Sequence, residues 1–243
     1  MKRELTHGSL FSGVEGFGLG AALAGIKTEW SCEFEKYQTK VIKKNFGDGH
    51  TVYGDIRTLE NPPFVNIISG GFPCQDISAA GKGAGIKGSR SGLWGQMHRI
   101  IGEVRPDYVI IENSPLLRKR GFEYVLHGLS EIGYDAQWQC LQGTFLGLQQ
   151  RRERIYIIAY PKGKFGEREC PKSVFREPYL PWKLGGVYPG WRERRDLPEP
   201  RTFGSTNGIP DLVDRNKCVG NAVQPLIAQY LFECIKCFDQ RKS

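Results

Sequence analysis

The sequence has no long apolar run. No stretch approaches the roughly 18 apolar residues that a membrane-spanning helix needs, and the segment Met1 to Leu5 lacks the apolar stretch of a secretory signal peptide. These absences predict a soluble, cytoplasmic protein that contacts no membrane. Hydrophobic residues make up 40% of the 243 residues, enough to bury a core, which argues against a disordered or fibrous chain.

The sequence also lacks a regular cysteine or histidine pattern. Seven cysteines at irregular spacings argue against a disulfide framework and favour reduced thiols. Cys234 and Cys237 have the spacing of half a zinc site, but no second pair or histidine cluster completes four ligands. We therefore expect no bound metal, and we find no internal repeat.

An excess of basic residues gives the chain a formal net charge of +8. Clustered Lys and Arg side chains displace counterions from a phosphate backbone, so this charge favours a polyanionic partner. Many basic proteins bind no nucleic acid, and the charge alone does not identify the partner.

Short β-branched or aromatic runs alternate with amphipathic stretches from Ser9 to about Tyr160, which is typical of a parallel sheet flanked by helices. The predicted strands are Thr6–Phe11, Thr28–Cys32, Thr51–Tyr53, Asn66–Ser69, Tyr108–Ile111 and Ile155–Ala159. The predicted helices are Tyr37–Asn45, Leu93–Val104, Phe122–Ile132 and Val223–Phe238. The pattern predicts a doubly wound, mostly parallel α/β domain.

We expect three segments along the chain. Residues 1–160 form the main α/β domain, residues 161–214 are rich in proline, glycine and arginine and form a small irregular lobe, and residues 215–243 carry a helix that returns to the first domain.

A glycine-rich turn, Phe11 to Gly20, follows the first predicted strand and leads into a helix, so its backbone can approach a nucleotide-like ligand. Glu33 follows the second strand about 20 residues on, where a carboxylate can accept hydrogen bonds from ribose hydroxyls. Asp55 follows the third strand and could contact adenine. The glycines could instead serve only a tight turn, and the two acids could serve only as helix caps. A site for NAD would explain the glycine-rich turn and Glu33 equally well.

Pro73, Cys74 and Gln75 come directly after the fourth predicted strand, at the edge where open sheets bind their ligands. Exposed backbone amides near the start of a helical turn favour the thiolate form of Cys74, which makes it a candidate nucleophile. The alternative is a small buried hydrophobic residue.

Glu112 ends the fifth predicted strand, so we expect its carboxyl group to lie beside Cys74. A partly desolvated carboxyl there can stay protonated and donate to a ring nitrogen, or it can simply cap a helix. In Gln150 to Arg154, alternation puts Arg152 and Arg154 on one strand face. These guanidinium groups could brace a base or bind phosphate, or they could belong to a solvated basic edge.

In this order, the motifs closely resemble those of the cytosine-5 DNA methyltransferases. Phe11 to Gly20, with Phe11, Ser12, Gly13 and Gly16, is similar to the family's cofactor loop, and Glu33 to its ribose-binding acid. The other matching segments are the adenine-contacting pair Asp55-Ile56, the catalytic Pro73-Cys74-Gln75, the acid motif Glu112-Asn113, the arginine motif Gln150 to Arg154 and the closing motif Gly220-Asn221-Ala222-Val223.

The resemblance implies a Rossmann-like fold and transfer of a methyl group from S-adenosylmethionine to carbon 5 of cytosine in double-stranded DNA. It implies that Cys74 adds to C6 of an extruded base while Glu112 stabilises the ring at N3. Extruding the base costs a few kcal/mol. The glycine-rich stretch Ala79 to Arg90 resembles the family's catalytic loop, and we expect a monomer of the restriction-modification type.

Two features depart from the family pattern. Ser114 follows Glu112-Asn113 where the family usually has valine, and the target-recognition region is short. A tRNA cytosine-5 methyltransferase is therefore one alternative, and a catalytically silent module that binds S-adenosylmethionine or DNA is another.

Overall fold

The structure is a computed structural model that describes residues 3–73, 92–146, 148, 150–163, 173–175 and 222–240. Within these residues, seven strands form one sheet in the order β3-β2-β1-β4-β5-β7-β6. The strands are β1 (Thr6–Leu10), β2 (Lys27–Cys32), β3 (Thr51–Tyr53), β4 (Ile67–Gly70), β5 (Tyr108–Asn113), β6 (Tyr134–Gln142) and β7 (Glu153–Pro161).

The first five strands of the chain run parallel, and β7 runs antiparallel to both β5 and β6. The strand order reverses between β1 and β4, which are neighbours in the sheet but far apart in the sequence. Ligands of open α/β sheets bind outside the carboxyl ends of the strands at this switch point. The segments that follow β1 and β4 are therefore placed for binding.

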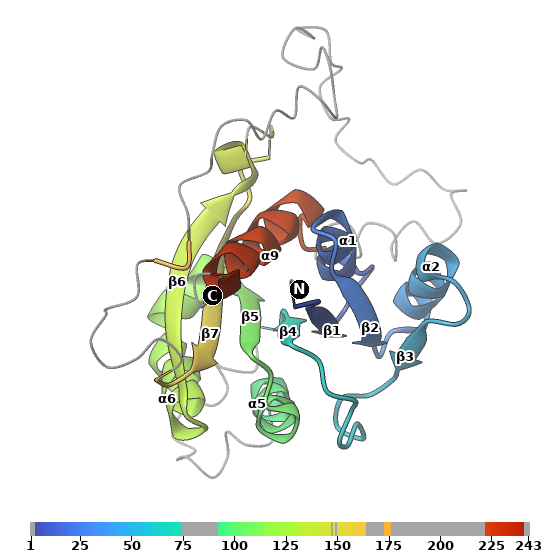
Figure 1. The fold of residues 1–243 in the computed structure, drawn as a ribbon, viewed down its shortest axis with the longest axis horizontal. Coiled ribbons are helices and arrows are strands. Elements are labelled where there is room, and N and C mark those ends of the chain that lie inside the picture. The colour runs from blue at the N-terminus through green and yellow to red at the C-terminus, as the bar shows by residue number, and fades with distance from the viewer. Residues whose placement is uncertain are drawn as a thin grey trace, which may run out of the picture.

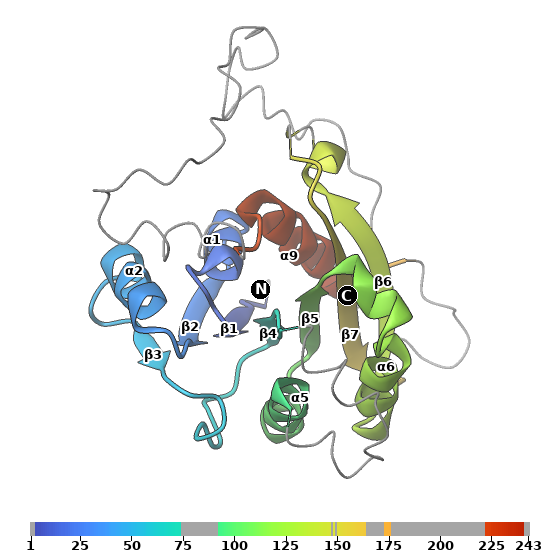
Figure 2. The same ribbon diagram turned by 180° about the vertical axis from the view of Figure 1, so that it is seen from behind.

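Helices cover both faces of the sheet (Figures 1 and 2). Helices α1 (Gly16–Leu23) and α9 (Pro225–Asp239) pack against each other on one face, while α5 (Leu93–Val104) and α6 (Phe122–Glu131) lie on the other. The remaining elements are α2 (Lys36–Phe46) and two short 3-10 helices, η1 (Pro115–Lys119) and η2 (Gly143–Leu146). The fold is the mostly parallel α/β fold that the sequence predicts.

The sheet separates two hydrophobic clusters. One joins α5 and α6 to the sheet through residues such as Met97, Ile100 and Leu129, and the other joins α1 and α9 through residues such as Phe17 and Leu231. The strands β4 and β5 are buried along their whole length, and their apolar residues at 67–68 and 108–111 face both covered sides of the sheet.

Helix α9 is held on α1 by close packing and by hydrogen bonds. A Cβ atom on Gly20 would lie 2.4 Å from Cβ of Ala228, so glycine lets the two backbones approach. Lys236 Nζ donates to the carbonyl of Ala24 at 2.6 Å, and Gln229 Nε2 donates to the carbonyl of Leu23, so α9 caps the C-terminal end of α1. The C-terminal helix thereby stabilises the element that follows the glycine-rich turn.

The predicted strands and helices are found, with shifts of one to a few residues at their ends. Strand β6 was not predicted. Its residues alternate irregularly between buried and partly exposed positions, with polar side chains at Asp135, Gln137 and Gln139, because it lies at the edge of the sheet. In the described part of the chain, no helix is long and apolar enough to cross a membrane.

Candidate active site

The glycine-rich loop, Phe11–Gly16, leaves the carboxyl end of β1 and is held on the end of β2. The amide of Glu15 donates to the carbonyl of Ser12 at 2.8 Å, and Ser12 N donates to the carbonyl of Cys32 at 3.1 Å. Phe11 and Gly13 have positive φ angles of 52° and 58°. The loop thus turns sharply over the switch point, with its shape fixed by backbone hydrogen bonds.

Glu33 lies beside this loop, immediately after β2. One oxygen, Oε2, accepts from the amide of Gly13 at 2.7 Å, and the other, Oε1, accepts from the amide of Glu35 at 2.8 Å. The residue is 9% exposed, and burial raises the pKa of its carboxyl group, while these two amides favour the charged form. A carboxylate anchored in this way keeps further lone pairs for the hydroxyls of a ribose.

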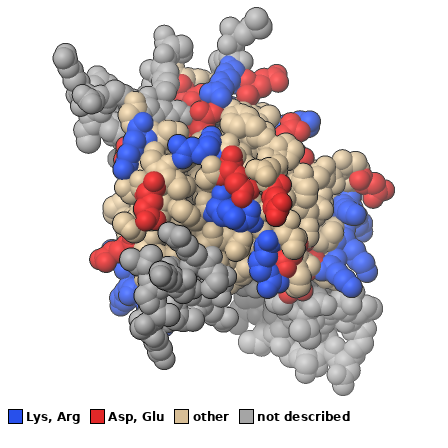
Figure 3. All heavy atoms as spheres, turned by 90° about the horizontal axis from the view of Figure 1, so that it is seen from below, with Lys and Arg blue, Asp and Glu red and all other residues tan. Residues whose placement is uncertain are grey.

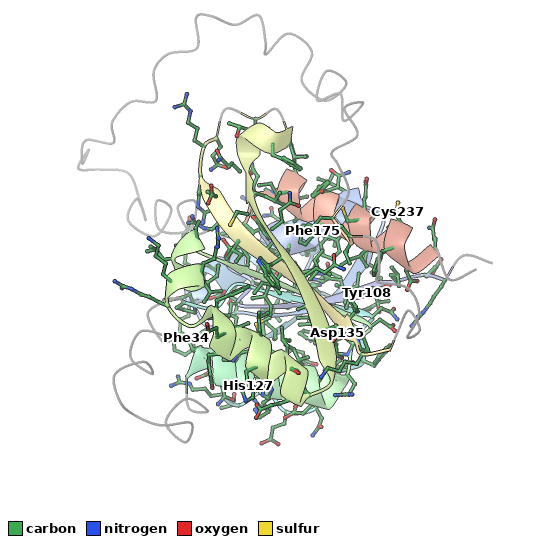
Figure 4. The ribbon with its side chains drawn as sticks, turned by 90° about the vertical axis from the view of Figure 1, so that its left-hand side faces the viewer. Phe34, Tyr108, His127, Asp135, Phe175 and Cys237 are labelled. Carbon is green, nitrogen blue, oxygen red and sulfur yellow. The ribbon has the colours of Figure 1, made fainter. Side chains whose placement is uncertain are left out.

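Phe34, which follows Glu33, is a further candidate site residue that no motif in the sequence indicates. Its side chain is 67% exposed, an unusual state for a large aromatic ring. In Figure 4, Phe34 and Tyr108 are labelled toward opposite ends of the parallel strands. Tyr108 begins β5 and Phe34 follows the end of β2, so Phe34 lies at the carboxyl edge of the sheet. An aromatic residue next to a candidate ribose acid is the signal that could have identified it, because such a ring can stack on a purine.

Asp55 and Ile56 follow β3, as predicted, but their environments differ. The carboxylate of Asp55 accepts from the amide of Arg57 and forms an ion pair with its guanidinium at 2.6 Å, which lowers the pKa of Asp55. Ile56 is buried in the core. A contact between Asp55 and an adenine amino group would therefore share the carboxylate with Arg57.

Glu112 ends β5 and forms an ion pair with Arg154 of β7, with 2.9 Å between Oε1 and Nε. The residues Glu112 and Tyr156 are cross-strand neighbours, so the antiparallel pairing brings Arg154 to the end of β5. Burial raises the pKa of Glu112, and the charges of Arg154 and Arg152 oppose this shift. The site thus contains an acid that burial drives toward the neutral form and that a cation holds in place.

The segment that leads to Cys74 packs directly against Glu112. A Cβ atom on Gly71 would lie 2.7 Å from Glu112 Oε2, so only glycine admits the carboxyl group there. Asn113 Nδ2 donates to the carbonyl of Phe72 at 2.9 Å in a buried position. Both members of the Glu112-Asn113 pair therefore contact the two residues that precede Pro73. The sequence pattern did not reveal this role of Asn113.

Ser114, where the family usually has valine, has a local structural role. Its hydroxyl accepts from the amide of Leu116 at 3.3 Å and caps the 3-10 helix η1. Ser114 therefore fixes the start of the short helix that follows β5.

Arg152 also lies near the charge of Glu112, but its hydrogen bond goes to a different part of the chain. Its Nη1 donates to the carbonyl of Ala222 at 2.6 Å, and burial and the neighbouring Arg154 lower its pKa. Val223 follows, and its carbonyl oxygen would lie 2.3 Å from a Cβ atom on Gly16. The closing segment Ala222–Val223 is therefore clamped between the glycine-rich loop and Arg152.

Some predicted site residues lie outside the described part of the chain. These are Cys74 and Asn221, together with most of the predicted lobe at 161–214. Pro73 is exposed and is the last described residue before this gap. Among the described residues, no three His, Cys, Asp or Glu side chains gather as a metal site would require. On the face in Figure 3, basic and acidic side chains are interspersed over the described residues.

Comparison with known proteins extends these observations. Two curated relatives are the type II methyltransferases M2.BsuMI of Bacillus subtilis, 37% identical over 62% of this chain, and M.HhaI of Haemophilus parahaemolyticus, 33% identical over 62%. The match covers 41% of the first and 47% of the second, so the chain spans about half the length of the curated relatives it matches.

Solved structures share the fold. The methyltransferase EhMeth of Entamoeba histolytica aligns with a TM-score of 0.64 over 99% of this chain and 100% of its own, at 14% identity. DNMT2 of Spodoptera frugiperda aligns with a TM-score of 0.55 over 67% of this chain and 51% of its own, at 20% identity. The sequence profile of the C-5 cytosine-specific DNA methylases matches residues 5–182, and the chain belongs to that family.

Proposed function

We propose that this protein is a DNA (cytosine-5)-methyltransferase that transfers a methyl group from S-adenosylmethionine to an extruded cytosine in double-stranded DNA. The observation that carries the proposal is the Glu112–Arg154 ion pair beside Gly71, in the segment that runs directly into Cys74. The family membership and the type II methyltransferases among the relatives support the same reaction.

The residues around the switch point fit S-adenosylmethionine. Glu33 would bind the ribose hydroxyls, Phe34 would contact the adenine, and the backbone of the glycine-rich loop would face the rest of the molecule. The closing segment Ala222–Val223 would complete the site next to Gly16. When bound, S-adenosylmethionine supplies an electrophilic methyl group to C5 of the base.

The chain's own residues would make the base reactive. Cytosine C5 is a poor nucleophile, and addition of the Cys74 thiolate to C6 raises its electron density. The buried carboxyl group of Glu112 would donate to N3 and so stabilise the charge that addition places on the ring. After methylation at C5, loss of the C5 proton restores the double bond and expels the thiolate.

The contact with Arg154 would keep the carboxyl group of Glu112 aimed at the base. Arg154 fixes the carboxyl group from β7, while Asn113 fixes the backbone of Phe72. Together they set the position of the acid relative to the segment that carries Cys74. Such positioning contributes to rate because the reacting groups need not be ordered at each turnover.

The experiment is a transfer assay on mixed-sequence duplex DNA with labelled S-adenosylmethionine, followed by bisulfite sequencing to identify the base. We expect label at cytosine C5 in duplex DNA, and a covalent complex with a 5-fluorocytosine duplex that the Cys74→Ala variant does not form. Label in tRNA with none in duplex DNA would establish the tRNA alternative. Cofactor binding with no label in either nucleic acid would establish a silent module and refute the proposal.

A further inference from the structure

Glu15 is a buried acid in the glycine-rich loop that the proposed reaction does not use. Glu15 is 1% exposed and has left-handed backbone angles, φ 66° and ψ 44°. Left-handed angles cost a residue other than glycine about 1 kcal/mol or more. A residue with an ionisable side chain therefore occupies a strained, buried position in the loop, which calls for a compensating role of its carboxyl group.

The carboxyl group of Glu15 caps the N-terminal end of helix α1. Oε1 accepts from the amide of Gly18 at 3.1 Å, and the carbonyl of Glu15 accepts from the amide of Leu19 at 2.9 Å. A Cβ atom on Gly18 would lie 2.5 Å from Cγ of Glu15, so the glycine makes room for this side chain. The loop, the helix and the acid thus form one packed unit.

Serine hydroxyls, rather than a cation, surround the carboxyl group. Ser31, Ser9 and Ser12 are its polar neighbours. Ser9 pairs with Ser31 of β2 and with Ser69 of β4, so a row of serines crosses the three central strands beneath the loop. Among the described residues, neither Glu15 Oε2 nor Ser9 Oγ has a hydrogen-bond partner of good geometry.

The basic groups on the elements around Glu15 are engaged elsewhere. His7, on β1, contacts Thr28 and Ser69 through its two ring nitrogens, and burial lowers its pKa to about 3, so it is neutral. His50 contacts the hydroxyl of Ser31 at 2.7 Å, and burial lowers its pKa as well.

The remaining charged groups near Glu15 are Lys236 and Glu33. Helix α1 carries no titratable side chain, and Lys236 of α9 binds the carbonyl of Ala24 at the far end of α1. Glu33 approaches the loop from its other side, at Gly13, and is itself an acid. The neighbourhood therefore favours an uncharged carboxyl group, since an isolated buried charge is costly. Burial raises the pKa of Glu15 to about 7, although the nearby serine hydroxyls and the hydrogen bond from Gly18 favour the charged form.

We propose that Glu15 is a positioning residue for the cofactor, whose neutral carboxyl group fixes the Phe11–Gly16 loop in its binding geometry. The inference rests on the proposed function in that the loop is taken to bind S-adenosylmethionine. Glu15 does not touch the ligand, because it is buried beneath the loop. Ionisation would place an unpaired charge under the turn and favour loop conformations that let water reach the carboxylate.

Cofactor affinity is therefore coupled to pH through Glu15. If only the neutral form holds the loop, affinity falls about tenfold between pH 6 and pH 8, since the competent fraction drops from about nine tenths to about one tenth. The side-chain amide that the Glu15→Gln substitution introduces cannot ionise, yet it offers the same acceptor to Gly18. This variant should keep the affinity of the neutral wild type throughout.

The experiment titrates the protein with S-adenosylhomocysteine by calorimetry between about pH 6 and pH 8. We expect the dissociation constant of the wild type to rise about tenfold and that of Glu15→Gln to change less than about threefold. Glu60→Gln is the matched control, because Glu60 is exposed and the change in charge is the same. This control should follow the wild type.

A wild-type affinity that is flat over this range overturns the proposal, whether or not the variant folds. A pH dependence that Glu15→Gln retains overturns it as well, because another group would then be titrating. The proposed function fails separately: binding of S-adenosylhomocysteine with the expected pH dependence but no methyl transfer to DNA supports the role of Glu15 and refutes the reaction. Absence of binding at every pH refutes both.

Discussion

Arg152 Nη1 donates a hydrogen bond of 2.6 Å to the carbonyl oxygen of Ala222, 70 residues away in the sequence. Arg154, two residues after Arg152, forms an ion pair with Glu112. Two neighbouring arginines of one motif thus serve different parts of the site. Arg152 holds the closing segment against the glycine-rich loop, and Arg154 holds the candidate catalytic acid.

Replacing Arg152 by alanine should therefore weaken cofactor binding more than it slows methyl transfer at saturating cofactor. A hydrogen bond from a charged group contributes about 1.5–3 kcal/mol, so we expect the dissociation constant of S-adenosylhomocysteine to rise about tenfold or more. Calorimetry and the KM for S-adenosylmethionine measure this effect. Arg151→Ala is the control, because Arg151 is exposed and should tolerate the change. An unaltered dissociation constant for Arg152→Ala would rule out the clamp.

Replacing Glu112 by glutamine should slow methyl transfer about 10²–10⁴-fold, the usual contribution of a general acid. The side chain keeps its shape, and the free energy of unfolding should change little. Single-turnover transfer from labelled S-adenosylmethionine gives the rate, and urea denaturation gives the stability. A rate near that of the wild type would show that the carboxyl group is not the acid.

The ion pair itself can be measured by a double-mutant cycle on the free energy of unfolding. Arg154→Ala alone leaves a buried carboxyl group without its cation and should destabilise the protein, whereas the loss should be smaller in the Glu112→Gln background. We expect a coupling of about 1–3 kcal/mol between the two positions. Additive effects would mean that the two side chains do not interact in solution.

Two glycine-to-alanine substitutions should have opposite effects on stability. Gly20→Ala would place Cβ 2.4 Å from Ala228 and should destabilise the protein by about 1–3 kcal/mol, because α1 and α9 cannot separate freely. Gly102→Ala, inside α5, meets nothing closer than 4.0 Å and should stabilise by about 0.5–1 kcal/mol. Thermal unfolding measures the stability of both variants. Equal changes in stability would contradict the close packing of α1 against α9.

The burial of His7 makes stability depend on pH. The folded state holds this histidine neutral, with its pKa lowered to about 3 by burial, while the unfolded state takes up a proton below about pH 6.5. The contribution to stability is thus complete above pH 6.5 and is lost as the pH falls, by about 2 kcal/mol at pH 5. Urea denaturation at pH 7.5 and pH 5 should show this loss in the wild type.

The His7→Gln variant should lose less stability than the wild type between these two pH values, whatever its stability at pH 7.5. His127→Gln is the matched control, because His127 is exposed on α6. It should keep the wild-type difference. If His7→Gln keeps it too, His7 does not carry the proton uptake.

Several elements of the fold could be predicted because their sequence patterns are local. Strand β5 is dense in apolar residues, and α5 has apolar residues three and four apart, so their burial follows from the sequence itself. Strand β6 could not be predicted in this way. Its place at the sheet edge leaves it half exposed, and its pairing with β7 is set by the fold rather than by its own residues.

The candidate site could also be predicted only in part from the sequence. The order of the motifs in the sequence identified Glu33, Glu112 and Arg154 as candidates and the sheet edge as their location. It did not reveal that Asn113 holds the carbonyl of Phe72 or that Asp55 is paired with Arg57. Cys74 and Asn221 remain predictions, since they lie outside the described residues.

The chemical groups of the site and the strand ends that carry them can be identified from short segments, because side-chain chemistry and strand propensity are local properties. Which of these groups meet depends on how the strands are arranged in the folded protein. The contacts of Arg152 with Ala222, Glu112 with Arg154 and Glu15 with the serine row depend on strand order and on antiparallel pairing. Those features arise from packing the whole sheet, and no local pattern encodes them.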